Sequence, residues 1–327
     1  MKYGLGKGWM GILFAVLMII TFGFAYNSVQ SNTICLAWQK AFGIEPGTMG
    51  IVLTALTLLI IFGGIQRVAK FSSTVVPVMA VVYLLIAVGV VVWNIASLPK
   101  VLLAIVENAF GFNQAAGGVL GVTVIQGIKR GLFSNEAGEG SAPNAAAVAT
   151  VSHPVKQGLI QALGVFTDTL VVCSCTAFII LVSGVDVTAS NGIQLTQDAL
   201  THEIGSIGNP FVAVMIWLFA FSSIIGNYYY GETNVRYIRD SKLGVFIYRL
   251  AVAAMVMVGA VVSLDFAWSF ADITMALLTL CNLVAIVLLS RQVVFLLQDY
   301  RQQKKEGKNP VFSKDKMPEI ADKLEAW

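Results

Sequence analysis

The sequence predicts an all-α, polytopic membrane protein. Of its 327 residues, 57% are hydrophobic and only 12% are charged, and the mean hydropathy is +0.79. Soluble domains usually carry about 25% charged residues. Apolar runs long enough to cross a bilayer as helices recur along the whole chain, and the short alternating strands of a membrane barrel do not. The net charge of +3 is dispersed among loops, so no nucleic-acid-binding patch is predicted.

Eight hydrophobic spans can be drawn along the chain. They cover approximately residues 9–37, 48–66, 73–95, 117–150, 157–184, 209–235, 243–264 and 267–292. The fourth is predicted to be interrupted, because its centre is too polar for a continuous helix that faces lipid. The first apolar run is too long for a signal-peptide core and lacks a cleavage pattern, so we expect it to remain as a helix.

Positive charges predict the direction of the spans. Lys2 and Lys7 precede the first span, and Arg236 and Lys242 follow the sixth. The loops expected on the opposite side are poor in lysine and arginine, and the long 185–208 loop has neither. Because positively charged loops stay in the cytoplasm, both termini are predicted to be cytoplasmic.

The polar centre of the fourth span is the stretch "GLFSNEAGEGSAPN", residues 131–144. Its glycines and Pro143 discourage an unbroken helix, and its small polar side chains and freed carbonyls could hold a cation or a zwitterion. A helix that restarts near Ser141 would favour a carboxylate at its N-terminal end. Because secondary transporters place substrate sites at broken helices, we predict solute binding here. A glycine-rich loop that only packs helices is the alternative.

This stretch, with "AAAVATVSHPVKQG" and then "FTDTLVVCSCTAFIIL", resembles the signature of the alanine or glycine:cation symporters of bacteria and archaea. A later block, "LFAFSSIIGNYYYGE", is also similar to that family, and the similarity covers essentially the whole chain. The resemblance implies sodium-coupled or proton-coupled uptake of alanine, glycine or a related small neutral amino acid across the bacterial cytoplasmic membrane. It implies no enzymatic activity and no organic cofactor. A monomer in the lipid bilayer is compatible with it.

The resemblance also implies the leucine-transporter type of fold, with two inverted repeats of five helices after one extra N-terminal helix. Relative to that pattern, three N-terminal helices are expected to be missing from this chain. Residues 1–292 would then form one transmembrane domain, with the rest of the first repeat in 1–95, the second repeat in 96–292 and a polar cytoplasmic tail in 293–327. On this interpretation a truncated, transport-inactive remnant is the alternative to a symporter. A channel is less favoured, because polarity is concentrated at one depth.

The resemblance assigns roles to individual positions. Asn135 and the loosened carbonyls near Ala137 would hold the polar end of the solute, and Phe133 would form an apolar wall. The full substrate-binding set is Gln30, Phe133, Ser134, Asn135, Ala137, Gly138 and Asn227, and the sodium ligands are Ser222 and Ser223. Sodium prefers hard oxygen ligands such as these hydroxyls. Helix packing is the alternative role for the two serines, and an interhelical hydrogen bond is the alternative for Gln30.

Charged residues inside the spans are the remaining candidates. Glu136 is an intramembrane carboxylate, which is costly unless it is paired or functional. Arg130 is its candidate partner, and both a structural ion pair and a proton-linked or gating role stay open. Asp168, in the fifth span, is expected to pair with Arg130 or with a backbone N–H, and a transport or gating role is the alternative. His153 and His202 lie in loops and are expected to be solvated, and the four cysteines are expected to act as small apolar side chains.

Overall fold

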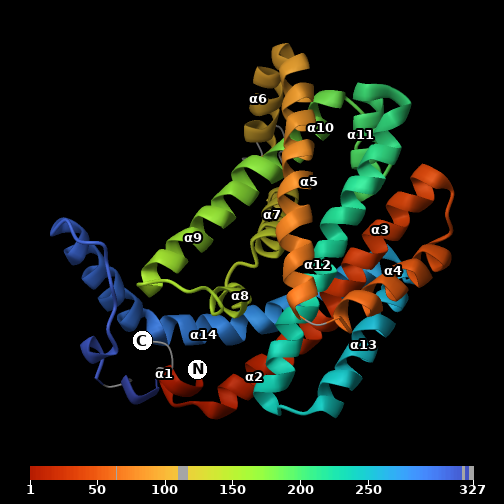
Figure 1. Ribbon diagram of the computed structural model, residues 1–327. Coiled ribbons are helices and arrows are strands. Elements are labelled where there is room, and N and C mark those ends of the chain that lie inside the picture. Colours follow the sequence, from red (N-terminus) through yellow and green to blue (C-terminus); the bar gives the residue numbers. More distant parts are fainter. Residues whose placement is uncertain (64, 110–116, 319–320, 324–327) are drawn as a thin grey trace.

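The structure is a computed structural model that describes residues 1–63, 65–109, 117–318 and 321–323 (Figure 1). Within these ranges every regular element is a helix, which confirms the all-α class. Helices occur at all eight predicted places. Among the described residues, five helical segments are long and apolar enough to span a membrane: Gly8–Phe42, Pro154–Ser183, Ile193–Ile238, Lys242–Val261 and Leu264–Lys305. A sixth span is possible if the helices Pro77–Trp93 and Ile95–Ala109, which are bent by 69° relative to each other, count as one. The count of eight and the division into inverted repeats stay predictions.

The first span is one continuous rod with a widened centre. It consists of α2 (Gly8–Met18), the π-helical turn η1 (Ile19–Tyr26) and α3 (Asn27–Phe42). A π-helical segment inside an α-helix is uncommon and is often found at functional sites. The rod ends at Gly43, whose φ of 70° gives the left-handed conformation that commonly closes a helix.

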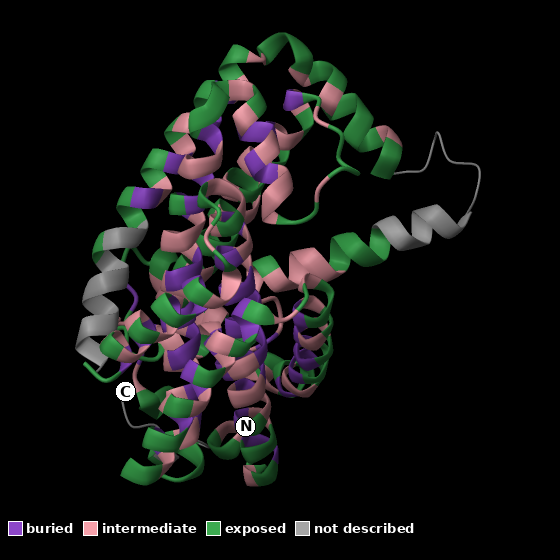
Figure 2. Ribbon diagram, turned by 90° about the vertical axis from the view of Figure 1, so that its right-hand side faces the viewer, coloured by how far each residue is buried: buried purple, intermediate pink, exposed green. Residues whose placement is uncertain are grey.

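The main core lies where α3 packs against three other helices. These are α4 (Pro46–Ile61), α12 (Gly208–Ile238) and α13 (Lys242–Val261). Small residues let the backbones approach closely: a Cβ on Gly259 of α13 would lie 2.5 Å from the backbone of Ser28. Such small-residue contacts are how membrane helices pack without a strong hydrophobic driving force. Buried residues gather inside the bundle and exposed ones on its outer faces (Figure 2).

A second core lies against α12 on the other side. It joins α5 (Ile65–Trp93), α10 (Ser174–Ser183) and α11 (Ile193–Ile204). Helix α11, which lies in the 185–208 segment, was not predicted from the sequence, and neither was α6 (Leu98–Ala109). Gln197 explains why α11 is a packed helix: its amide donates to the carbonyl of Ala37, at 3.0 Å.

The remaining helices surround the fourth span. They are α1 (Lys2–Leu5), α9 (Pro154–Thr167), the π-helical turn η3 (Asp168–Cys173) and α14 (Leu264–Lys305). Because α14 continues to Lys305, the first part of the predicted polar tail is helical. The structure also has four short helical turns, η2 (Ile95–Ser97), η4 (Gly205–Ile207), η5 (Lys314–Lys316) and η6 (Ala321–Lys323). All four cysteines are free.

The ends of the helices fall into two groups at opposite ends of the molecule. In Figure 1, α1 and the loop between α12 and α13 lie at the lower end of the molecule, and α6 and α11 lie at the upper end. The amide of Gln292 on α14 donates to the carbonyl of Gly4, at 3.5 Å, which ties the N-terminal segment to the later part of α14. The segments with the predicted cytoplasmic charges therefore share one end.

Candidate functional site

The predicted break in the fourth span is present. Helix α7 (Gly117–Asn135) ends at Asn135, and α8 (Ala142–Ala146) begins only after an irregular segment. Glu136, Gly138 and Gly140 have φ values of 47°, 79° and 81°. A positive φ is uncommon outside glycine, so Glu136 marks a special backbone position. Pro143 lies in the first turn of α8, as predicted, but the alanine run does not extend the helix beyond Ala146.

The irregular segment, residues 136–141, lies directly on α14. A Cβ added to Gly140 would come within 2.8 Å of Asn282, and one added to Gly138 within 3.2 Å of Thr279 and Leu283. The Asn282 amide donates to the freed carbonyl of Gly138, at 2.8 Å. Glycine is therefore needed here both for its backbone angles and for the close approach of the two chains.

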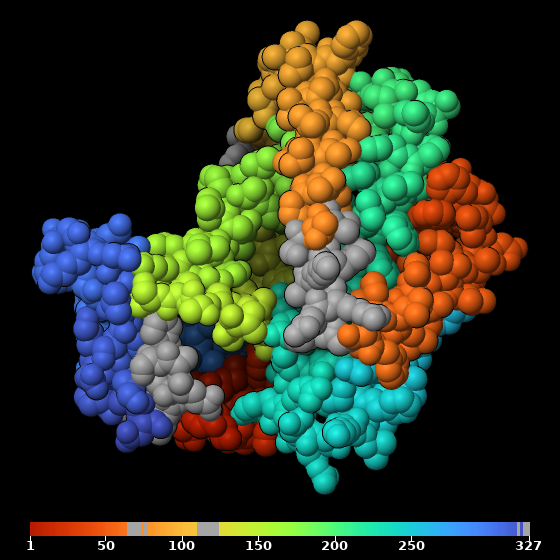
Figure 3. Space-filling model, viewed as in Figure 1, coloured from red at the N-terminus to blue at the C-terminus, as the bar shows by residue number. Residues whose placement is uncertain are grey.

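A cavity of about 770 Å³ opens beside this segment. Figure 3 shows the hollow between the yellow-green α8 region and the red N-terminal residues. Residues from α1, α2, α8, α12 and α14 line it, and its main polar lining residues are Glu136, Asn144, Thr233, Asn234 and Asn282. Two of these join neighbouring helices, because the Asn234 amide donates to Asn144 Oδ1, at 3.2 Å. The cavity lies at the end predicted to be cytoplasmic.

The predicted substrate residues of α7 face other protein groups. Phe133 packs between Tyr26 and Trp268, with ring centroids 4.7 and 4.8 Å away. Asn135 donates to the carbonyl of Gly131, at 3.0 Å, and its Oδ1 accepts a hydrogen bond from Thr169. Neither side chain lines the cavity.

Two other predicted substrate positions flank the break. The hydroxyl of Ser134 donates to Asp168, at 3.0 Å. Gly138 does line the cavity, whereas Ala137 closes the end of α7 through a backbone bond to the Leu132 carbonyl, at 3.1 Å.

The predicted ion pair between Arg130 and Glu136 is wrong. Arg130 pairs with Asp272 on α14, and its guanidinium lies 4.1 Å from the ring centre of Trp268. Glu136 accepts a hydrogen bond from the Ser141 hydroxyl instead. Asp168 does not pair with Arg130 either, because Arg130 lies against Asp272. The Oδ2 atom of Asp168 instead accepts hydrogen bonds from the Ser134 hydroxyl, at 3.0 Å, and from the Cys173 thiol, at 3.8 Å.

Glu139 was not among the site residues predicted from the sequence. Its side chain is fully buried, and the hydroxyl of Tyr26 donates to Oε1, at 2.7 Å. Among the described residues, Oε2 has no hydrogen-bond partner. The only signal in the sequence is its place between two glycines in an apolar span. The packing of Tyr26, which lies 113 positions earlier, decides its environment.

The first and sixth spans meet through asparagines. Asn227 donates to Asn27 Oδ1, at 3.1 Å, and Asn27 donates to the carbonyl of Gly23, at 3.0 Å. Gln30 is half-buried on α3 and does not line the cavity. Ser222 and Ser223 are half-buried and both donate to the Phe219 carbonyl of their own helix, at 2.7 and 3.2 Å. Because these hydroxyl oxygens remain free to act as ligands, sodium binding there stays a prediction.

Comparison with known proteins decides the family. The sequence model of the sodium:alanine symporter family matches residues 1–314. The chain belongs to this family. It is 54% identical to the probable sodium/glutamine symporter GlnT of Bacillus subtilis, over 96% of the chain and 66% of that protein. It is 50% identical to the amino-acid carrier protein AlsT of the same organism, over 99% of the chain and 69% of that protein.

An archaeal relative shows how far the family similarity extends. The sodium/alanine symporter AgcS of Methanococcus maripaludis is 35% identical, over 94% of the chain and 68% of that protein. The chain spans about two thirds of the length of these curated relatives. The match confirms the resemblance that the motif around Asn135 predicted.

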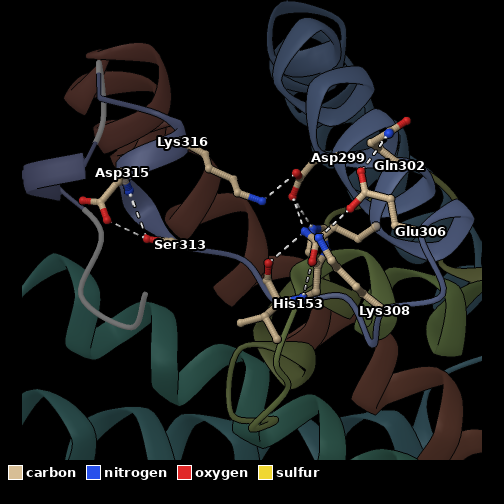
Figure 4. A network of polar contacts seen from close by, with 10 residues as sticks. His153, Asp299, Gln302, Glu306, Lys308, Ser313, Asp315 and Lys316 are labelled. Atoms are coloured by element: carbon tan, nitrogen blue, oxygen red, sulfur yellow. Dashed lines mark hydrogen bonds and ion pairs between the residues drawn. The ribbon is translucent and has the colours of Figure 1, made fainter.

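In this family member the loop after α8 is held by the C-terminal segment (Figure 4). His153 is fully buried, not solvated as predicted. His202 is exposed as predicted, but it lies in α11 and not in a loop. The N–H of Val155 donates to His153 Nδ1, at 3.2 Å, which caps α9. The proton of the neutral ring therefore lies on Nε2, which donates to Asp299 Oδ2, at 3.3 Å. Burial lowers the pKa of His153 from its ordinary value.

The same Asp299 receives the tail. Lys316 pairs with Asp299 Oδ1, at 2.7 Å, and the N–H of Phe312 donates to the carbonyl of Ser152, at 2.8 Å. The ring of Phe312 lies 5.8 Å from that of His153. The tail is thus attached to the loop that links α8, and with it the broken span, to α9.

Proposed function

We propose that this protein is a secondary transporter that couples uptake of a small neutral amino acid to inward flow of sodium or protons. The observation that carries the proposal is the break at residues 136–141, which lies beside a cavity of about 770 Å³. Broken membrane helices expose backbone groups that can bind a charged solute, and such cavities keep those groups hydrated. The family match over residues 1–314 favours a symporter over a transport-inactive remnant.

We also infer which side of the site is closed. Under the predicted topology, α7 and α14 both begin on the extracellular side. The Arg130–Asp272 pair and the contact of Phe133 with Trp268 then lie between the break and the outside. The cavity lies on the other side of the break and is lined by Met1, Lys2 and Tyr3. This arrangement supports a state closed to the outside and open to the cytoplasm.

The chemistry of the substrate follows from the groups available. A zwitterion offers a carboxylate to N–H and amide donors, and an ammonium group to carbonyls and carboxylates. Asn144, Asn234 and Glu136 supply both kinds of group along the cavity. Relatives are named for alanine and for glutamine, so both amino acids are the first to test.

Uptake by purified protein in proteoliposomes tests this function. Radiolabelled alanine, glycine and glutamine are offered separately under an inward sodium gradient, an inward proton gradient, both, or neither. We expect at least one amino acid to accumulate above its outside concentration under a gradient, and accumulation to vanish when the gradient is collapsed. Uptake that only equilibrates, or does not exceed that of protein-free vesicles, would contradict the proposal.

A further inference from the structure

We propose that Glu139 is a proton-binding site through which amino-acid uptake is coupled to inward proton flow. This inference rests on the proposed transport function and adds the atom that carries the coupling ion. The role proposed for Glu139 differs from the one considered for Glu136, which lines the cavity and accepts a hydrogen bond from the Ser141 hydroxyl.

The carboxyl group of Glu139 lies in an environment that disfavours its charged form. Glu139 is fully buried, its Oε1 accepts one hydrogen bond from the neutral Tyr26 hydroxyl, and its Oε2 has no partner among the described residues. A buried carboxylate without a cation or several donors is strongly disfavoured, and protonation removes the charge. In this conformation Glu139 therefore holds a proton on Oε2.

The charged groups near Glu139 do not include a free cation among the described residues. The titratable groups that face Glu139 and Tyr26 are Glu136 in the same segment and Asp272 on α14. Asp272 is already paired with Arg130 and with Lys129, at 3.3 Å for the lysine. No ion pair to Glu139 is formed within the part of the chain that the structure describes, so a cation that balances it must come from solution.

The surroundings of Glu139 offer too few oxygen ligands for a metal ion but enough for a proton. A hard metal ion is held by several oxygen ligands at once, supplied by the protein or by bound waters. Glu139 has one oxygen without a hydrogen bond, and its side chain is sealed away from the cavity. A proton needs only that one oxygen.

Rearrangement of the irregular segment gives the proton a way to leave. Glu136 and Glu139 belong to one irregular segment, yet Glu136 lines the cavity and Glu139 lies on the sealed side with Tyr26. The left-handed positions at 136, 138 and 140 give this segment backbone conformations that a helix lacks. When the segment rearranges during transport, Oε2 gains a proton from the outer solution or releases it to the inner one. Each release carries one positive charge inward with a neutral amino acid.

Infrared spectroscopy tests the protonation without requiring transport. The unmodified protein in lipid, near neutral pH, is compared with Glu139→Gln and with the matched variant Glu136→Gln. We expect a carboxylic acid C=O band that disappears in Glu139→Gln and persists in Glu136→Gln. A band of equal size in Glu139→Gln would overturn the proposal. Tyr26→Phe, which keeps the ring but removes the hydrogen bond, should shift this band; an unshifted band would also count against the assignment.

Proton-driven uptake tests the coupling. With an inward proton gradient and equal sodium on both sides, the unmodified protein should accumulate the amino acid. In Glu139→Gln, proton-driven accumulation should fall to the level of protein-free vesicles. Amino-acid exchange, measured in the same preparation, serves as the reference for the amount of active protein. Glu306→Gln, an exposed tail position, is the control. Proton-driven accumulation in Glu139→Gln would overturn the inference.

The two proposals fail differently. If the unmodified protein accumulates the amino acid on a sodium gradient but never on a proton gradient, the role of Glu139 is wrong and the transport function stands. If no amino acid is transported at all, the transport function fails, and with it the coupling role; the infrared band then reports only a protonated carboxyl group.

Discussion

At Gly140 the chain turns with a φ of 81° directly against Asn282 of α14. We expect Gly140→Ala to destabilise the protein by about 1–3 kcal/mol, because the left-handed angle disfavours a side chain and the new Cβ would lie in the space of Asn282. The measurement is thermal unfolding in detergent or lipid. Gly127→Ala is the matched control, since nothing lies within 4 Å of its Cβ position. Equal melting temperatures for the two variants would contradict this account of the break.

The Arg130–Asp272 pair allows a double-mutant cycle. If the two side chains close the extracellular side together, Arg130→Ala and Asp272→Ala should each lower the initial rate of uptake. Expressed as a free-energy change, the loss of uptake rate in the double variant should then be smaller than the sum of the losses in the two single variants. Residues in direct contact typically show coupling energies of about 0.5–3 kcal/mol. Strictly additive losses would show that the pair does not act as a unit.

The hydroxyl of Ser223 provides the test of sodium binding. If it is a sodium ligand, Ser223→Ala should raise the sodium concentration needed for half-maximal uptake while leaving the unfolding temperature nearly unchanged. Ser290→Ala is the matched control, because its hydroxyl also donates to a carbonyl of its own helix, at 2.7 Å, on the exposed part of α14. An unchanged sodium dependence in Ser223→Ala would remove this residue from the site.

At the scale of elements, the attachment of the tail to the start of α9 is expected to depend on pH. The pKa of His153 in the folded protein lies below its ordinary value of about 6.5, because burial disfavours the charged ring. Its contribution to stability is therefore present above the ordinary pKa and is lost as pH falls toward the folded pKa. Protonation of Nδ1 also breaks the cap on α9, because that nitrogen accepts from Val155.

Hydrogen exchange of the tail measures this dependence. Protection of the Phe312 N–H should fall as the pH is lowered below about 6.5, after correction for the intrinsic exchange rate. The charged side chains that face the His153 ring are Asp299, Lys316 and Lys156, and neither variant described next changes them. In His153→Asn, whose side chain can still cap the helix, the pH dependence should disappear, whereas His202→Asn should retain it. A pH-independent tail in the unmodified protein would contradict the assignment.

The positions of helices could be predicted from the sequence better than the side-chain contacts between them. Apolar runs located helices at all eight places, and the glycines and Pro143 located the break, because both depend on local composition. Helix α11 was missed because its amphipathic sequence resembles a polar loop until Gln197 meets α3. The partner of Arg130 was wrong because the partner lies on α14, 142 positions away, and only the tertiary structure brings the two together. The same holds for Glu139 and Tyr26.

At the scale of the whole molecule, the broken span lies between the packed contact of Phe133 with Trp268 and the cavity. The outer faces of the bundle are apolar, as a lipid environment requires; on α9, for example, Leu163 is 64% exposed. Transport would require the closed side to open while the cavity closes, and ligand binding must favour one of these states over the other. The break is the natural place for that change, since it contacts both α14 and the cavity.

The most direct test of this account is the accessibility of Ala147, which lines the cavity just after α8. Ala147→Cys is prepared with the four native cysteines replaced by alanine, and vesicles of each orientation are treated with a membrane-impermeant thiol reagent. We expect labelling from the cytoplasmic side, and we expect it to slow when the transported amino acid and its coupling cation are added together. Labelling from the extracellular side alone, or at a rate that substrate and cation leave unchanged, would contradict it.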